Sequence, residues 1–272
     1  MSELALYRSA AFNVFALQPG MRRDVLVVSF MYHRPRPALT SGGFGQHYLW
    51  TAGLDAVHVL PAANTWYQHA EMPAVLRTIT AFRQAQGHAR LVTYGFSMGA
   101  YAAVNFCGLL DASDAVALMP QATLDPALVP AENRWRREAA TLRFTQHHLR
   151  PEAPAATRCL VLYDPAHALD TAHLRLISAV RQVEAVPLRF NQHRAPPAAV
   201  MQAALLGASE AAPDVAAQVA RLWRRHRVAQ PRAWLNAARA QRLGSARQRR
   251  LLRRAALLWW RGSALAARLG WG

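Results

Sequence analysis

The sequence predicts an α/β protein with a mostly parallel, doubly wound sheet. Strand-like and helix-like segments alternate along most of the chain, which is typical of a sheet covered by helices on both faces. Several strand-like segments are continuous aliphatic runs, as buried parallel strands require. Hydrophobic residues make up 53% of the 272 positions, enough for one large core. We therefore expect one α/β domain over residues 1–228, followed by a helical tail over residues 229–272.

The expected elements follow the apolar runs and the proline positions. The predicted strands are Asn13–Leu17, Asp24–Phe30, Ala56–Leu60, Leu91–Tyr94, Ala115–Met119, Arg158–Tyr163 and Val186–Phe190. The predicted helices are Phe44–Ala52, Met72–Gln86, Met98–Leu110, Glu132–His147, Thr171–Val183, Pro197–Leu206 and Val215–Arg227. Prolines punctuate residues 121–157, which leaves room for little more than one helix there. We expect any cap over the sheet to be small.

The most informative stretch is residues 91–101, Leu-Val-Thr-Tyr-Gly-Phe-Ser-Met-Gly-Ala-Tyr. A β-rich run leads into Gly-Phe-Ser-Met-Gly, and a helix-compatible segment of small residues follows. Side chains at Gly95 or Gly99 would collide with the neighbouring strand or helix, so such a turn is sharp and strained. It would expose the hydroxyl of its central residue. The pattern predicts a nucleophile elbow with Ser97 as the nucleophile.

A serine hydroxyl at neutral pH needs a base that takes its proton, and the base needs an orienting acid. His193 follows the last predicted strand, and Asp164 directly follows the strand before it. The order Ser, Asp, His is the one found in hydrolases with this type of turn. Asp164 is favoured as the acid because it lies 29 residues before His193. Asp170 is the alternative acid, although its position also suits the N-cap of the following helix.

Acyl transfer also needs hydrogen-bond donors for the developing oxyanion. One donor would be the backbone N–H of Met98, directly after the nucleophile. The other would come from the loop after the strand that ends near residue 29, from the backbone of Phe30 or Met31. A backbone donor places no demand on the side chain, so the sequence leaves both open.

Two segments beside the expected site have more than one interpretation. Trp66 and Tyr67 follow the strand Ala56–Leu60 and could form a pocket wall that stacks on a sugar or acyl group. Alternatively, they pack a loop onto the body. The run Glu132–Arg137 could place arginines over the site for an anionic substrate, or it could form a solvated helix face.

These residues together resemble the α/β-hydrolase superfamily. The resemblance covers roughly residues 10–225 and depends on the elbow, the strand and helix order, and the Ser–Asp–His sequence. It implies an α/β-hydrolase fold in which Ser97 is the nucleophile, His193 the general base, Asp164 the orienting acid and the Met98 N–H an oxyanion donor. The expected function is an esterase or acyl hydrolase acting on a small or carbohydrate-linked ester. A non-catalytic scaffold of the same fold, which binds a ligand or a membrane surface, is the alternative.

The formal charge of +17 is concentrated near the C-terminus. Residues 221–272 hold 14 of the 32 basic residues and no acidic residue, and every basic residue of the chain is arginine. On a helix from 241 onward, Arg250, Arg254, Arg261 and Arg268 share one side, while Leu251, Ala255, Leu258, Leu265 and Leu269 share another. Such a helix suits an anionic membrane surface, with nucleic acid as a second polyanion. Docking of the helix on the body is the third interpretation.

The sequence contains no pattern of histidines, cysteines or acids with the spacing of a metal site, and no cofactor is expected. The two cysteines, Cys107 and Cys159, lie in apolar settings and are expected to be buried and reduced. The start of the chain lacks the pattern of a secretory signal. The expected location is therefore cytoplasmic, with the tail allowing a place at the inner face of the membrane.

Overall fold

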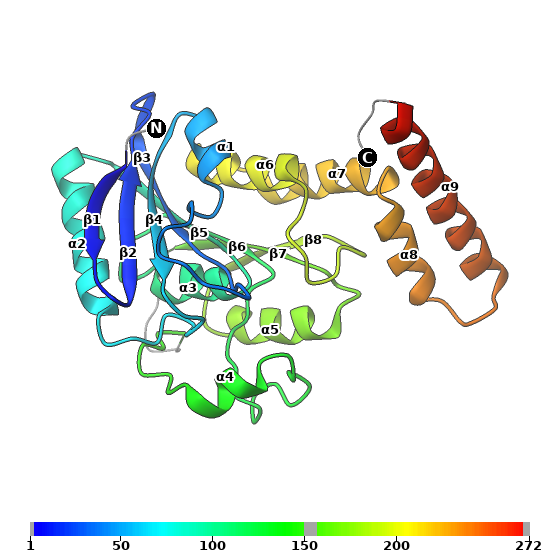
Figure 1. Cartoon of the computed structure of the whole chain (residues 1–272), viewed down its shortest axis with the longest axis horizontal. Coiled ribbons are helices and arrows are strands. Elements are labelled where there is room, and N and C mark those ends of the chain that lie inside the picture. Colours follow the sequence, from blue (N-terminus) through cyan, green and yellow to red (C-terminus); the bar gives the residue numbers. More distant parts are fainter. Residues whose placement is uncertain (1–2, 150–156, 269–272) are drawn as a thin grey trace.

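The computed structural model describes residues 3–149 and 157–268, and the part described contains one eight-stranded sheet (Figure 1). The strand order is β1-β2-β4-β3-β5-β6-β7-β8, and the strands from β4 to β8 in that order run parallel. β1 and β2 are an antiparallel pair at one edge. The strands are β1 (Leu4–Arg8), β2 (Phe12–Leu17), β3 (Arg22–Phe30), β4 (Leu54–Pro61), β5 (Arg90–Phe96), β6 (Asp114–Leu118), β7 (Arg158–Tyr163) and β8 (Val183–Pro187).

The strand order reverses at β3: the chain first adds β4 on one side of β3 and then adds β5, β6, β7 and β8 on the other side. Loops at the carboxyl ends of β3 and β5 therefore diverge to opposite sides and leave a crevice, the usual place for a site in an open parallel sheet. The segment after β5 is the turn that contains Ser97. The order of the strands thus places the predicted nucleophile at this switch point.

Seven of the eight strands overlap the predicted ones. β1 is the exception: it is a five-residue edge strand without a buried side chain, and its short apolar run, Leu4–Tyr7, does not by itself distinguish a strand from a helix or a loop. β8 lies at Val183–Pro187, about three residues before the predicted strand Val186–Phe190. Its half-buried Glu184 and exposed Ala185 interrupt the apolar pattern and hide its start in the sequence. The shift gives residues 188–197 to a loop, and His193 lies in that loop.

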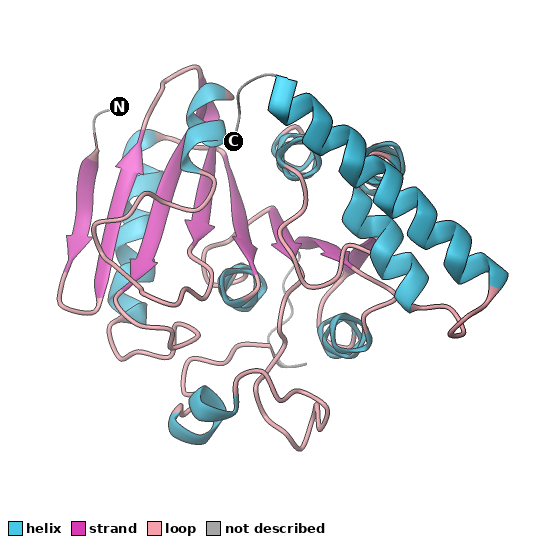
Figure 2. Ribbon diagram, turned by 45° about the vertical axis from the view of Figure 1, so that its right-hand side comes forward, coloured by secondary structure: helices cyan, strands magenta, loops and turns pink. Residues whose placement is uncertain are grey.

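Helices cover both faces of the sheet, as Figure 2 shows. One apolar cluster joins the sheet to α2 (Met72–Gln86), α3 (Met98–Phe106) and α5 (Ala168–Ser178). A second cluster joins the other face to α1 (Gln46–Thr51), α6 (Ala198–Ser209) and α7 (Val215–Val228). All nine residues of α3 are buried. The helix that follows the serine is therefore firmly packed, and the doubly wound α/β prediction is confirmed.

The predicted helix Glu132–His147 is mostly wrong. Only α4 (Arg136–Thr141) is helical in this stretch, and none of its residues is buried. The preceding residues fold into a tight turn because the Glu132 side chain accepts hydrogen bonds from the Arg134 backbone and guanidinium. Beyond α4, Gln146 is held by the Gln68 side chain in a loop. The segment forms a loop-rich cover of the small size expected, although residues 150–156 lie outside the described part.

The tail contains two helices where one was expected, α8 (Pro231–Arg239) and α9 (Ala246–Arg268), which form a hairpin beside α7 (Figure 1). Leu251 and Ala255 of α9 face α8, and Gln248 donates to the carbonyl of Ala238. Two side chains of the predicted apolar side, Leu251 and Ala255, therefore pack within the hairpin. Leu257 and Trp260 are exposed instead. The side chains of Leu265 and Arg268, and the whole of Leu269, lie outside what the structure describes.

Candidate active site

The turn after β5 has the geometry of a nucleophile elbow. Ser97 is the N-cap residue of α3 and has φ 53° and ψ −116°, a strained backbone conformation for a residue with a side chain. A Cβ at Gly99 would lie 2.2 Å from the carbonyl oxygen of Phe30, and a Cβ at Gly95 would lie 2.2 Å from the backbone of Gly99. The contact is with backbone in both cases, so neither position has room for a side chain. The flanking glycines therefore hold Ser97 at the apex of the turn.

Ser97 and His193 meet although they lie 96 residues apart. The Oγ of Ser97 is 2.9 Å from the Nε2 of His193, within reach of a hydrogen bond from hydroxyl to imidazole. The ring of Phe96 packs beside the imidazole, with ring centroids 5.7 Å apart. The structure thus brings together the two residues that the sequence pairs as nucleophile and base.

The carboxylate that contacts His193 is that of Asp170, which corrects the assignment of Asp164. The Nδ1 of His193 lies 3.0 Å from the Oδ1 of Asp170. Asp170 is in the first turn of α5, and His167, not Asp170, is the N-cap residue of that helix. The backbone N–H of Asp164 donates to the Oδ2 of Asp170 at 3.3 Å, so this helical turn lies over the end of β7. The number of residues between the acid and His193 favours Asp164, but it does not reveal that the first turn of α5 lies over the end of β7 and brings Asp170 to His193.

Asp164 instead anchors the loop that carries His193. Its side chain is fully buried, and its Oδ1 accepts hydrogen bonds from the backbone N–H groups of Ala166 and Phe190, each at 2.9 Å. Its Oδ2 accepts one from the N–H of Gln192 at 2.7 Å. Phe190 and Gln192 both adopt positive φ, at 71° and 60°. Asp164 therefore stabilises a strained loop and positions His193 without contact with its ring.

Asp170 is held in its ionised form by two histidines. Its Oδ1 also lies 2.9 Å from the Nδ1 of His167. Burial by itself raises the pKa of the Asp170 carboxyl, but the hydrogen bonds from His167 and His193 outweigh burial and hold that pKa well below its ordinary value. A carboxylate at this position keeps the proton of His193 on Nδ1. The Nε2 of His193 is then free to accept the proton of Ser97.

The pKa of His193 is lowered from its ordinary value near 6.5. Burial is the largest cause, and the positive charge of Arg134 lowers the pKa further. The hydrogen bond with Asp170 raises it but does not offset these effects. The imidazole is therefore neutral at neutral pH, which is the state that a general base requires.

Gln121, which the sequence analysis did not single out, also contacts the serine. Its Nε2 donates to the Oγ of Ser97 at 3.2 Å, and its Oε1 accepts from the indole N–H of Trp66 at 3.1 Å. Gln121 is fully buried and lies three residues beyond the end of β6. The end of the strand next to β5 is a position from which a side chain can reach the elbow. The place of Gln121 shortly after a predicted strand was therefore the only feature of the sequence that could have indicated its contact with Ser97.

Trp66 and Tyr67 do not form a pocket wall, contrary to the prediction. Both are fully buried in the core. Trp66 holds Gln121, and the hydroxyl of Tyr67 donates to the carbonyl of Met31 at 2.8 Å. The packing interpretation is therefore the correct one for both aromatic residues, because neither exposes a ring face on which a substrate could stack. Trp66 still lies one hydrogen-bonded residue away from Ser97.

The two backbone positions proposed for the second oxyanion donor lie at the end of β3. The N–H of Met31 donates to the carbonyl of Val59 at 3.3 Å, so this group extends the sheet. Phe30 is still within the strand and pairs with β4 and β5. The next residue, Tyr32, packs its ring against Phe96 with ring centroids 5.8 Å apart. Met98 is the first residue of α3, so its N–H has no partner within the helix.

An arginine is held near the site by a buried acid. The carboxylate of Glu132 accepts from the guanidinium of Arg134, from its Nε at 2.9 Å, and lies 3.0 Å from the Nε2 of His173. Burial raises the pKa of Glu132, but the hydrogen bonds from Arg134 and His173 dominate and lower it to about 2. The segment is thus not a simple solvated face: Arg134 is half-buried, and Arg136 and Arg137 are exposed.

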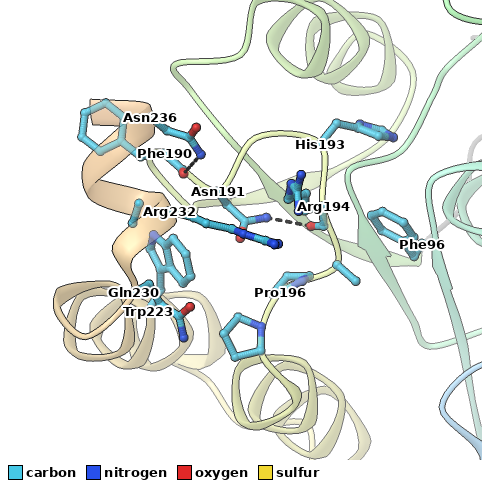
Figure 3. A pocket seen from close by; sticks show the side chains of 13 residues that line it. Phe96, Phe190, Asn191, His193, Arg194, Pro196, Trp223, Gln230, Arg232 and Asn236 are labelled. Atoms are coloured by element: carbon cyan, nitrogen blue, oxygen red, sulfur yellow. Dashed lines mark hydrogen bonds between the residues drawn. The ribbon is translucent and has the colours of Figure 1, made fainter. Parts of the chain in front are cut away.

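A pocket of about 600 Å³ lies beside the His193 loop (Figure 3). Its walls come from the end of β5, the loop after β8, α7 and the first turns of α8. The lining residues are Phe96, Phe190, Asn191, His193, Arg194, Ala195, Pro196, Pro197, Trp223, Gln230, Arg232, Ala233 and Asn236. The volume is in the range of small-molecule sites. The pocket adjoins both the base and the residue before the nucleophile.

Comparison of this arrangement with solved structures gives several matches of low sequence identity. A putative hydrolase from Agrobacterium vitis S4 has a TM-score of 0.52 and 12% identity, covering 76% of this chain and 98% of its own. An acetyl xylan esterase from Paenibacillus sp. R4 has a TM-score of 0.52 and 11% identity, covering 74% and 79%. The capsule O-acetyltransferase of Neisseria meningitidis serogroup A has a TM-score of 0.50 and 10% identity, covering 69% and 86%.

This chain has the α/β-hydrolase fold. No protein-family model matches it, and no curated protein matches its sequence. At 10–12% identity the three structures show the fold and leave the chemistry to the residues of this chain. The elbow with Ser97, the loop with His193 and the first turn of α5 with Asp170 follow the carboxyl ends of β5, β8 and β7.

Within the described part of the chain, no group of three or more His, Cys, Asp or Glu side chains is arranged to hold a metal ion. None of the helices searched there combines the length and the apolar character that crossing a bilayer requires. Cys107 and Cys159 are buried and unbridged, as expected from their apolar settings.

Proposed function

We propose that this chain is a serine-dependent ester hydrolase in which Ser97 is the nucleophile, His193 the general base and Asp170 the orienting acid. The observation that carries the proposal is the continuous set of contacts from hydroxyl to carboxylate, 2.9 Å from Ser97 to His193 and 3.0 Å from His193 to Asp170. Both distances suit proton transfer and orientation in acyl transfer. The strained backbone of Ser97 supports the same assignment.

The proposed reaction begins when the Nε2 of His193 takes the proton of Ser97. The Oγ attacks the ester carbonyl, and the imidazolium then gives the proton to the leaving alkoxide, which departs as an alcohol. The acyl group remains on Ser97. Water attacks this ester with His193 again as the base, which releases the carboxylic acid and restores the hydroxyl. Asp170 stabilises the imidazolium in both half-reactions.

The developing oxyanion needs donors that are fixed before the reaction starts. The N–H of Met98 is the first donor in this proposal. The second is the N–H of Tyr32, because those of Phe30 and Met31 belong to the sheet, whereas the Tyr32 amide has no hydrogen-bond partner in the described part of the chain. The ring contact between Tyr32 and Phe96 supports a place beside the elbow. This choice replaces the two positions expected from the sequence.

The experiment that tests the proposal is labelling with a fluorophosphonate probe, together with hydrolysis of a small aryl acetate. We expect wild-type protein to be labelled and to turn over the ester, and Ser97→Ala to do neither. The loss of turnover should be roughly 10⁴-fold or more, as when the nucleophile of a serine triad is removed. Circular dichroism of the Ser97→Ala protein checks that it is folded.

Equal labelling of wild type and Ser97→Ala would contradict the proposal, because the probe would then react elsewhere. Failure of the folded wild-type protein both to be labelled and to hydrolyse any ester of a broad panel would also contradict it. That second result would favour the alternative, a non-catalytic α/β-hydrolase scaffold that binds a ligand or a membrane surface. The two outcomes therefore separate an enzyme from a binding protein.

A further inference from the structure

The charges around the pocket beside His193 are all of one sign. Arg194 and Arg232 line the pocket, and no aspartate or glutamate does. Both arginines are exposed, and neither guanidinium has a hydrogen-bond or ion-pair partner within the described part of the chain. Figure 3 shows both side chains between α8 and the His193 loop, although they come from different elements. Two arginines without an acid raise the local affinity for an anion.

The start of α8 adds to this positive field. Gln230, Arg232 and Ala233 from its first turn line the pocket, and that turn contains no acidic residue. The N-terminal end of a helix has a partial positive charge from its unpaired N–H groups. The sequence has no acidic residue after Asp214, so α8 and α9 contribute no compensating negative charge.

The walls of the pocket are held in place by hydrogen bonds to the backbone of the histidine loop. The side chain of Asn236 on α8 donates to the carbonyl of Phe190 at 2.9 Å. The side chain of Asn191 donates to the carbonyl of Arg194 at 2.7 Å. The indole of Trp223 on α7 donates to the carbonyl of Arg189 at 3.3 Å. The tail and the catalytic loop therefore form one wall, and a preformed wall lowers the entropy cost of binding.

We propose that this pocket binds the anionic part of the ester substrate, a phosphate or a carboxylate, between Arg194 and Arg232. This inference rests on the proposed function, because it assigns a substrate class to the same site. The anion occupies the pocket while the ester carbonyl lies at the end formed by Phe96 and His193, next to Ser97. It also gives the basic tail a role in substrate binding, since α8 supplies Arg232.

The test compares three aryl acetates that differ in one group: 4-acetoxybenzamide, 4-acetoxybenzoate and 4-acetoxyphenyl phosphate. We expect the ratio of kcat/KM for an anionic ester to that for the neutral ester to fall about tenfold in Arg232→Gln and in Arg194→Gln, mainly through KM. A larger fall for the phosphate ester identifies a phosphate site, and a larger fall for the benzoate identifies a carboxylate site. Arg239→Gln is the matched control, because Arg239 is also on α8 but does not line the pocket.

A second measurement does not depend on turnover. Calorimetric titration of the Ser97→Ala protein with phenyl phosphate and with benzoate should give binding that Arg232→Gln weakens and Arg239→Gln does not. If phenyl phosphate or benzoate binds in this way but the probe does not label the wild type, the anion site is supported and the esterase proposal is contradicted. If the wild type hydrolyses the three esters without preference for an anionic one, and Arg232→Gln changes nothing, the anion site is contradicted and the esterase proposal is not.

Discussion

The serine side and the histidine side of the site are built in different ways. The turn that holds Ser97 is one continuous segment, β5, the elbow and α3, and its geometry follows from close backbone approaches, of Gly95 to Gly99 and of Gly99 to the end of β3. The histidine side is assembled from three separate segments, because His193 depends on Asp164 after β7, on Asp170 in α5 and on a strained loop after β8. The conformation at Ser97 thus follows mainly from the local sequence, whereas the position of His193 depends on hydrogen bonds between segments far apart in the sequence.

This difference explains why two aspartates only six residues apart have separate roles. Asp164 makes its hydrogen bonds with backbone N–H groups, whereas Asp170 makes its shortest ones with the rings of His167 and His193. The first carboxylate holds the shape of the loop, and the second sets the tautomer of the base. Substitution of each should therefore affect a different measurable property.

The largest expected effect separates these two roles. Asp170→Asn should lower kcat/KM by roughly 10³- to 10⁴-fold, because an amide does not stabilise the imidazolium and allows the wrong tautomer of His193. Asp164→Asn places an NH₂ group against a backbone N–H. It should lower the free energy of unfolding by about 2–4 kcal/mol, through one lost charge-assisted bond and one unsatisfied donor. Ester hydrolysis and urea unfolding of both variants give the comparison.

The reverse pattern would break the distinction. If Asp164→Asn lost activity at unchanged stability while Asp170→Asn remained active, Asp164 would be the catalytic acid and the contact between Asp170 and His193 would be incidental. Asp125→Asn is a suitable control, because Asp125 is exposed and its side chain accepts, among the described residues, a hydrogen bond from the N–H of Ala127 alone. We expect it to change neither property.

The same contrast decides how much the sequence could predict. The roles of Ser97, Gly95 and Gly99 and the positions of most strands can be predicted from local sequence patterns, namely apolar runs and the glycine requirement of one sharp turn. The choice of Asp170 over Asp164 and the contact of Gln121 with Ser97 could not be found in this way, because they depend on how α5 and the segment after β6 fold back over the sheet. The buried state of Trp66 and Tyr67 is likewise a property of the packed loop, not of the residue types.

The next effect is smaller and belongs to the serine side. Gln121→Glu keeps an oxygen for the indole of Trp66 but replaces the donor to Ser97 with a carboxylate oxygen, which repels negative charge on the Oγ. We expect kcat to fall roughly 10- to 100-fold with little change in KM, and the free energy of unfolding to fall as well because the new carboxylate is buried. Single-turnover hydrolysis and thermal unfolding measure both. A Gln121→Glu protein with wild-type kcat would show that Gln121 only packs beside the elbow.

The smallest effect concerns the pH dependence of the base. His193 must be neutral to act, so activity rises with pH through its pKa, which lies below the ordinary value. Arg134 contributes to that lowering by its positive charge. Replacement of Arg134 should therefore raise the pKa of His193, and activity should fall on the acid side while the alkaline plateau changes least.

This last test needs a double variant, because Arg134→Gln alone would leave the carboxylate of Glu132 buried without its main partner. Glu132→Gln/Arg134→Gln removes both charges and keeps groups of similar size. Its profile of kcat/KM against pH should lie to the alkaline side of the wild-type profile. Arg137→Gln, which removes one arginine charge at an exposed position of α4, should overlie the wild type. A shift toward acid pH in the double variant would mean that Arg134 does not act on His193 through its charge. The segment with Glu132 and Arg134 would then influence His193 only through packing. The electrostatic effects on the His193 pKa would come from Asp170 and His167 alone among the groups considered above.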